Sequence, residues 1–197
     1  NCPSPYYALA HSMGGLIAIT AAARGKLPFE RMVMAAPAFA FAVPEAFGGA
    51  MDRAGERLVG FGLTARAVPG YEIFAHDRRP FIGNRATSDR SRFARHAEVL
   101  KRAPQLAIGP PTFGWMHAFA EARRRARGPH FADRITAPVL MIGGSKDKVI
   151  STPAAGEFAR RLKAGHHLVI PGGRHALLIE RDPIRQQLWD AFDAFVP

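Results

Sequence analysis

Cysteine is almost absent from this 197-residue chain. Cys2 is the only one, so no disulfide can form within the chain. Because chains without disulfides suit a reducing compartment, we expect a cytoplasmic protein, with peripheral contact at the inner face of a membrane as an alternative. No apolar run approaches the roughly 20 residues that a membrane-spanning helix requires.

Motifs for several kinds of ligand are also missing. No cluster of His, Cys and Asp has the spacing of a metal site, and no Gly-rich phosphate loop is present, so we expect no metal and no cofactor. Nucleic acid is disfavoured as a partner, because the arginines are scattered among alanines without a recognition-helix, zinc-finger or RNA-binding aromatic motif.

Acidic residues are few, and the formal net charge is +11. Residues 43–134 hold 16 Lys and Arg against 9 Asp and Glu, so most of the excess lies in the middle of the chain. One interpretation is an arginine-rich surface that water solvates. The other is attraction to an anionic membrane surface or an anionic substrate.

Apolar residues are plentiful, at 48% of the chain, and their pattern predicts an α/β fold. Short continuous apolar runs indicate parallel strands buried on both faces, and helical patterns lie between them. The strands are expected at 6–10, 31–37, 137–144 and 167–170, with helices at 13–25, from Pro153 to Gly165, and from an N-cap at Asp182 onward.

The segment between the second and third expected strands is too long for a loop. Its composition indicates short helices near 45–63, 89–102 and 113–127, so we interpret it as a helical cap or lid inserted between two strands. The predicted division is therefore a core at 1–40, a cap at 41–133 and a second core segment at 134–197.

A tight corner is predicted at Ser12, where a strand ends and a helix begins at once. Ala10 and Gly14 flank Ser12 at a distance of two residues, and such small residues let strand and helix backbones approach closely. This is the arrangement of a nucleophile elbow, with free N–H groups and the positive helix end where an oxyanion would form. The alternative is a plain strand-to-helix turn.

Two further reactive side chains follow later strands, and they favour the catalytic interpretation. Asp147 comes after the third strand and His175 after the fourth, so the chain order is Ser, Asp, His. Imidazole can take the serine proton during attack, and a carboxylate fixes the imidazole tautomer. The backbone N–H of Met13 is one oxyanion donor by position. We expect His11 to be structural, beside the elbow, and Trp115 to be cap core rather than an acyl-binding wall.

With these residues in place, the chain resembles α/β-hydrolases of the lysophospholipase and monoacylglycerol lipase group, which is serine aminopeptidase-like. The segments that carry the resemblance are His11–Gly15, Gly143–Asp147 and Gly172–His175. The cap stretch from Leu63–Thr64 to Thr87–Asp89, with Gly114–Trp115, is more similar to the bacterial lysophospholipases. The resemblance implies hydrolysis of one fatty-acyl ester in a single-chain glycerolipid, through an acyl-serine intermediate and without a cofactor.

The sequence departs from this family in two ways. Ala10 stands where a glycine is usual, and the resemblance covers only the carboxyl-terminal portion of the family's sheet. We therefore expect the second oxyanion donor in a preceding part of the protein, and poor stability or association of the 197-residue piece alone. An aminopeptidase or small-ester hydrolase with the same triad, and a non-catalytic lipid- or membrane-binding module, remain as alternatives.

Overall fold

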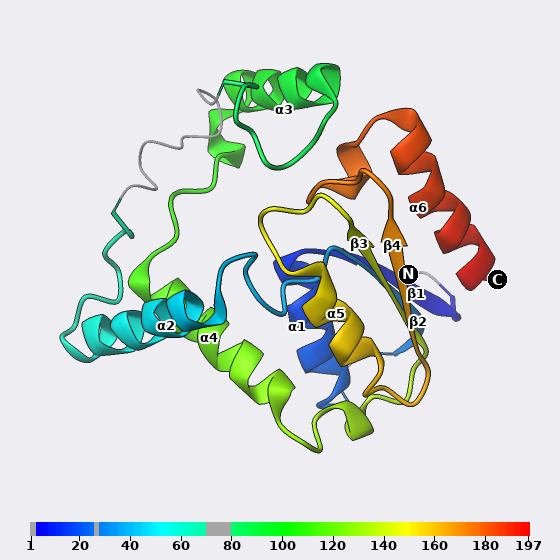
Figure 1. Ribbon diagram of the computed structural model, residues 1–197, viewed down its shortest axis with the longest axis horizontal. Coiled ribbons are helices and arrows are strands. Elements are labelled where there is room, and N and C mark those ends of the chain that lie inside the picture. The colour runs from blue at the N-terminus through cyan, green and yellow to red at the C-terminus, as the bar shows by residue number, and fades with distance from the viewer. Residues whose placement is uncertain (1–2, 26–27, 70–79) are drawn as a thin grey trace. The chain divides into compact units, whose positions relative to one another are not determined.

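A computed structural model of the chain describes residues 3–25, 28–69 and 80–197. Four parallel strands form one sheet, in the spatial order β1-β2-β3-β4. The α/β fold class is therefore confirmed, with the long helical segment inserted between the second and third strands (Figure 1). The strands are β1 (Tyr6–His11), β2 (Phe29–Ala35), β3 (Val139–Gly144) and β4 (Gly165–Ile170).

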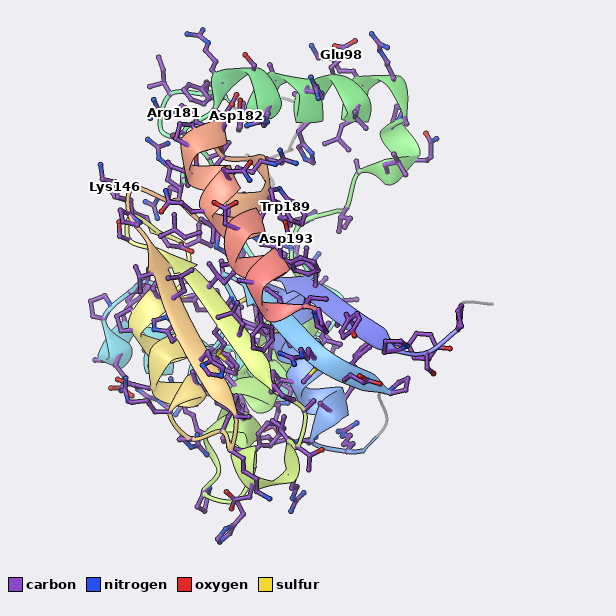
Figure 2. The ribbon with its side chains drawn as sticks, turned by 90° about the vertical axis from the view of Figure 1, so that its right-hand side faces the viewer. Glu98, Lys146, Arg181, Asp182, Trp189 and Asp193 are labelled. Atoms are coloured by element: carbon purple, nitrogen blue, oxygen red, sulfur yellow. The ribbon has the colours of Figure 1, made fainter. Side chains whose placement is uncertain are left out.

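Helices cover both faces of this sheet. The C-terminal helix lies on one face, and the helices that follow β1 and β3 lie on the opposite face (Figure 1). Figure 2 shows the C-terminal helix along the sheet, with Asp182 at its first turn and Asp193 near its end. The three helices are α1 (Met13–Ala22), α5 (Thr152–Ala159) and α6 (Asp182–Phe195).

The two faces of the strands contribute to two packed layers. Side chains at alternate positions, such as Val33 and Ile142, join the cluster that includes Leu188 of α6. Their neighbours Met34 and Met141 are fully buried as well. β2 and β3, which are buried over most of their length, read as continuous apolar runs rather than alternating ones. The expectation of burial on both faces is wrong for β1 and β4, because β1 is mostly half-buried and β4 mostly exposed.

The chain divides into two compact units. The first consists of 1–42, 85–88 and 122–197, and contains the whole sheet. The second consists of 43–84 and 89–121. Its helices are α2 (Glu45–Gly60), α3 (Arg90–Arg102) and the first part of α4 (Phe113–Arg127), which continues into the first unit. A role of the second unit as a cap stays a prediction.

Local contacts explain the shape of the second unit. Gly114 N–H donates to the Thr64 carbonyl oxygen (3.0 Å), and a Cβ on Gly114 would lie 3.0 Å from that same oxygen. The N-terminus of α3 is capped by the Asp89 carboxylate, which accepts from Arg92 N–H. Trp115 stacks on Phe119, with ring centroids 5.2 Å apart, and Phe119 is buried.

Several predicted helix boundaries are wrong. The helix expected at 13–25 ends at Ala22. The helix expected from Pro153 to Gly165 ends at Ala159, and Gly165 instead opens β4, where it pairs with Val139. A Cβ on Gly165 would collide with the Ala159 carbonyl oxygen. Asp182 is the first residue of α6 rather than its N-cap, which is Arg181. Nothing in the described ranges of the chain forms a helix that is both long and apolar enough to span a membrane.

Candidate active site

Ser12 stands at the corner between β1 and α1, in a backbone conformation that few serines adopt. Its φ is 53° and its ψ is −120°. Neighbouring backbone holds this geometry: Ser12 N–H donates to the Ala35 carbonyl oxygen (3.0 Å), and Ser12 O accepts from Ala38 N–H (3.1 Å). Strain of this kind persists where the surrounding structure fixes it, and it is concentrated at functional sites.

Small residues make the corner sterically possible. A Cβ on Gly15 would lie 2.9 Å from Pro37 Cβ, so only glycine fits there without a shift. A Cβ on Gly14 would lie 4.0 Å from Ala10 Cβ, which is an ordinary contact. Ala10 is thus accommodated at the position where the family usually has glycine.

The structure brings together the three residues that the sequence singled out, all within the first unit. His175 Nε2 lies 3.0 Å from Ser12 Oγ, and His175 Nδ1 lies 2.9 Å from Asp147 Oδ2. The side chains of His175 and Asp147 are only 11% and 1% exposed. The other carboxylate oxygen of Asp147 accepts from Val149 N–H (2.7 Å) and Ile150 N–H (3.0 Å), which fixes its orientation.

These contacts determine the direction of proton transfer that the site allows. A carboxylate only accepts, so His175 donates its Nδ1 proton to Asp147 and leaves Nε2 free to accept the Ser12 hydroxyl proton. Met13 is the first residue of α1, where backbone N–H groups have no partner within the helix. The arrangement is that of an activated serine nucleophile beside a potential oxyanion donor.

Paired glycines let the Asp147 and His175 loops touch. A Cβ on Gly144 would collide with the Gly173 carbonyl oxygen, and it would lie 2.8 Å from the Arg174 carbonyl oxygen. The Gly173 oxygen also accepts from Lys146 N–H (2.8 Å). The glycines at the end of β3 and after β4 are therefore a sequence signal for this approach.

His11 lies directly against His175. Its Nε2–H donates to the His175 carbonyl oxygen (3.1 Å), and the two ring centroids are 5.0 Å apart. Burial lowers the pKa of His11 below its ordinary value of 6.5, despite the opposing effect of that hydrogen bond. The sequence placed His11 beside the elbow, but it gave no sign of this contact with the His175 backbone.

Two other histidines make contacts that do not involve these three residues. His130 pairs with Asp133 on the exposed surface (3.2 Å), and the His166 ring packs edge-on against Phe195. His76 falls outside the residues that the structure describes. Within the described part of the chain, no three His, Cys, Asp or Glu side chains are grouped so that they could hold a metal.

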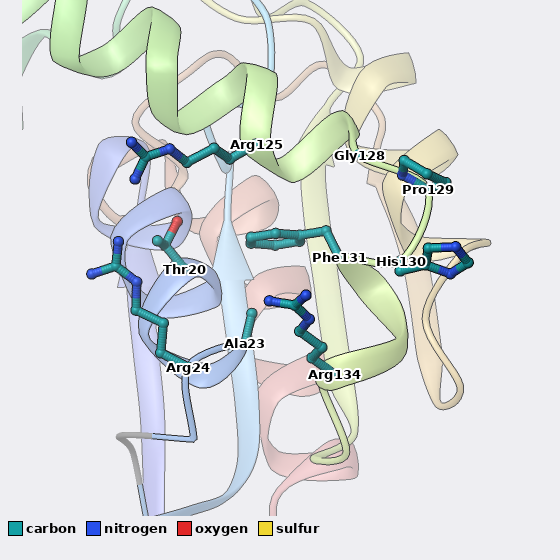
Figure 3. Close-up of a pocket in the computed structure, with 9 residues that line it drawn as sticks. All are labelled: Thr20, Ala23, Arg24, Arg125, Gly128, Pro129, His130, Phe131 and Arg134. Atoms are coloured by element: carbon teal, nitrogen blue, oxygen red, sulfur yellow. The ribbon is translucent and has the colours of Figure 1, made fainter.

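A pocket of about 480 Å³ lies at the far end of α1 from Ser12. Since α1 has 10 residues, its ends are about 15 Å apart. Figure 3 shows the Phe131 ring with Arg134 below it, and Arg24 and Arg125 on the side of Thr20 and Ala23. Arg24 follows the end of α1 and Arg125 lies in the last turn of α4, where positive charge stabilises a helix dipole. The pocket is therefore separate from the Ser12 corner.

The fold and this corner define an α/β-hydrolase. The model of the serine aminopeptidase, S33 family matches residues 2–182, and the chain belongs to that family. This confirms the expected relationship to hydrolases of the lysophospholipase and monoacylglycerol lipase group.

Individual relatives are distant and longer. The chain is 23% identical to a probable lysophospholipase L2 of Haemophilus influenzae, over 98% of this chain and 60% of that protein. It is 27% identical to lysophospholipase L2 of Escherichia coli K12, over 93% of this chain and 56% of that protein. The chain thus spans less than two thirds of either relative.

Solved structures show the same fold. A soluble variant of the Saccharomyces cerevisiae monoglyceride lipase superposes with a TM-score of 0.73 at 17% identity, covering 98% of this chain and 64% of that one. A thermostable carboxyl esterase of Bacillus coagulans gives a TM-score of 0.66 at 20% identity, with the same coverage.

Proposed function

We propose that the protein containing this chain is a serine hydrolase that cleaves a carboxylic ester of a single-chain glycerolipid. The observation that carries the proposal is the continuous hydrogen-bonded line from Ser12 Oγ through the His175 ring to Asp147. Two ordinary hydrogen bonds on opposite ring nitrogens are what a serine nucleophile needs in order to lose its proton at neutral pH.

The first half of the reaction forms an acyl-serine. Ser12 Oγ attacks the ester carbonyl carbon while His175 Nε2 takes its proton, and Asp147 stabilises the imidazolium that results. The tetrahedral intermediate then expels the glycerol-side alcohol, which receives the proton from His175. In the second half, water attacks the acyl-serine with His175 again as base, releasing the fatty acid and restoring Ser12.

Negative charge develops on the carbonyl oxygen in both steps. The Met13 N–H lies at the positive end of α1 and is placed to donate to that oxygen. One such donor contributes about 10²- to 10³-fold to the rate.

The substrate class rests on the relatives. Two lysophospholipases and a monoglyceride lipase are among the proteins similar to this chain, and both activities release one acyl group from a glycerolipid. The net charge of +11 is compatible with a phosphate-bearing lipid or an anionic lipid surface. It is equally compatible with a solvated arginine-rich surface.

Labelling with a fluorophosphonate probe tests the enzymatic part of the proposal. In the full-length protein, mass spectrometry should locate the probe on Ser12, and Ser12→Ala should abolish labelling. Asp147→Asn should retain Ser12 but lower ester hydrolysis by about 10⁴-fold, because the carboxylate fixes the His175 tautomer. An unlabelled Ser12 in a folded protein would leave the non-catalytic binding module as the better interpretation.

A release assay tests the substrate class. Lysophosphatidylcholine, a monoacylglycerol, a short p-nitrophenyl ester and an aminoacyl p-nitroanilide should be compared at equal enzyme concentration, with Ser12→Ala as the blank. We expect the highest kcat/KM for one of the two glycerolipids. Preference for the anilide would instead support an aminopeptidase, which the family description also allows.

A further inference from the structure

A second buried polar cluster lies beside the proposed active site, centred on Glu180. This carboxylate is fully buried, and it follows His175 by five residues. Burying a carboxylate is costly unless hydrogen bonds replace the lost water. Its partners therefore indicate what the residue does.

The partners of Glu180 come from two segments that are distant in sequence. Oε1 accepts from Arg174 N–H (3.0 Å). Oε2 accepts from Ser88 N–H (2.9 Å), from the Ser88 hydroxyl and from Arg181 N–H (3.3 Å). One carboxylate thus joins the loop that carries His175 to Ser88. Ser88 belongs to the short segment Arg85–Ser88, which we call the strap.

The strap has an unusual position in the chain. The residues on either side of it, 43–84 and 89–121, belong to the second unit, whereas the strap itself belongs to the first. Thr87 is fully buried and donates from its hydroxyl to the Ile179 carbonyl oxygen (2.7 Å). The hydrogen bonds of these four residues explain the position, because they reach the segment from Arg174 to Glu180.

The strap holds the residues on both sides of His175. Arg174 is held twice, since its N–H donates to Glu180 and its guanidinium donates to the Thr87 carbonyl oxygen (2.9 Å). Ala176 N–H donates to the Ala86 carbonyl oxygen (2.7 Å). The backbone on either side of the imidazole is therefore fixed by the strap, directly or through Glu180.

We infer that Glu180 is a positioning residue, which clamps the His175 loop to the strap and so sets the distance from His175 Nε2 to Ser12 Oγ. The inference rests on the proposed function. Its physical basis is that His175 contributes to catalysis only at hydrogen-bond range of both Ser12 and Asp147, and a misplacement of about 1 Å can cost about 10²-fold in rate.

A charged acceptor suits this point because two of the groups that contact Oε2, the backbone N–H groups of Ser88 and Arg181, can only donate. In Glu180→Gln, an amide group must replace one carboxylate oxygen. Placed at Oε2, its N–H₂ faces the donors of Ser88 and Arg181; placed at Oε1, it faces Arg174 N–H. Either orientation breaks the clamp while preserving side-chain volume.

The test compares Glu180→Gln with Ser88→Ala in the full-length protein. We expect Glu180→Gln to lower kcat for a p-nitrophenyl ester by about 10- to 100-fold with KM within about twofold, and to slow fluorophosphonate labelling of Ser12 similarly. Ser88→Ala keeps the backbone donor and loses only the hydroxyl, so we expect a smaller loss of kcat. Hydrogen exchange of the Arg174 and Ala176 amides should accelerate in Glu180→Gln.

Leu188→Ala is the matched control for lost stability. Leu188 is fully buried against the sheet in the same unit, and its apolar side chain makes none of the hydrogen bonds that join the strap to the His175 loop. Leu188→Ala and Glu180→Gln should each be assayed at the same interval below their own Tm. Under these conditions Leu188→Ala should keep wild-type kcat. If Glu180→Gln does not fold, Ser88→Ala becomes the deciding variant. Wild-type kcat together with wild-type hydrogen exchange at Arg174 in Ser88→Ala would overturn the inference.

Failure of the inference is separable from failure of the proposed function. An unlabelled, inactive wild-type protein argues against the proposed function. A labelled, active wild type with an equally active Glu180→Gln argues only against the role of Glu180. Faster exchange at Arg174 with unchanged kcat would show that the clamp is structural, and that result would also overturn the inference.

Discussion

The Nε2–H of His11 donates to the backbone carbonyl oxygen of His175 across 3.1 Å. His11 ends β1 and directly precedes Ser12, whereas His175 lies in the loop after β4. This hydrogen bond therefore ties the nucleophile corner to the loop that carries the proposed base. It supports His175 from the sheet side, while the strap fixes its neighbours along the chain.

Two substitutions of His11 should distinguish the effect of losing its hydrogen bond from the effect of losing its ionisable ring. His11→Gln retains an N–H donor that can reach the His175 carbonyl oxygen, so we expect kcat to fall by less than about tenfold. His11→Leu removes the donor and should cost about 1–3 kcal/mol of unfolding free energy, together with a larger loss of kcat. Urea denaturation and ester hydrolysis measure the two effects. Equal kcat in both variants would contradict this role.

The lowered pKa of His11 gives stability a pH dependence. Above its ordinary value of 6.5, His11 is neutral in both the folded and the unfolded chain. As the pH falls below that value, the unfolded chain binds a proton before the folded one does, so the free energy of unfolding decreases. His167 contributes in the same direction, because burial and Arg160 lower its pKa as well.

Urea denaturation between about pH 5.5 and pH 7.5 measures this dependence. The free energy of unfolding should fall as the pH is lowered, and His11→Gln should flatten the slope. The remaining slope then belongs to His167 and other groups. A slope that His11→Gln leaves unchanged would show that the folded chain does not disfavour the His11 imidazolium.

Gly144→Ala should disturb the contact between the Asp147 and His175 loops. The added methyl collides with the Gly173 carbonyl oxygen, and backbone atoms must shift to make room. We expect a loss of about 1–3 kcal/mol in unfolding free energy, and a fall in kcat as His175 moves relative to Asp147. Thermal melts and ester hydrolysis provide the measurements.

Gly60→Ala is the control for this substitution. Gly60 ends α2, and a Cβ there meets nothing within 4 Å. It should leave kcat unchanged and be neutral or stabilising by up to about 1 kcal/mol, because alanine favours the helix. If Gly144→Ala behaved like Gly60→Ala, the close approach of the two loops would not matter for the site.

The sequence by itself determined the sheet and the three reactive side chains. Continuous apolar runs identify the central strands β2 and β3, because both faces of these two strands are covered. Parallel strands bring their carboxyl ends to one edge of the sheet, so Ser12, Asp147 and His175 could be placed together without coordinates. The small residues around Ser12 predicted the sharp corner for a similar reason, since only they permit its close contacts.

Only the tertiary structure decided what holds these side chains in place. The sequence indicated that Gly165 ends a helix, but pairing with Val139 places it in β4. Nothing in the local pattern of Glu180 or His11 distinguishes them from surface residues, because their partners lie 92 and 164 positions away, at Ser88 and His175. Periodicity reports which face of an element is buried, whereas a hydrogen bond between distant loops depends on how the whole chain folds.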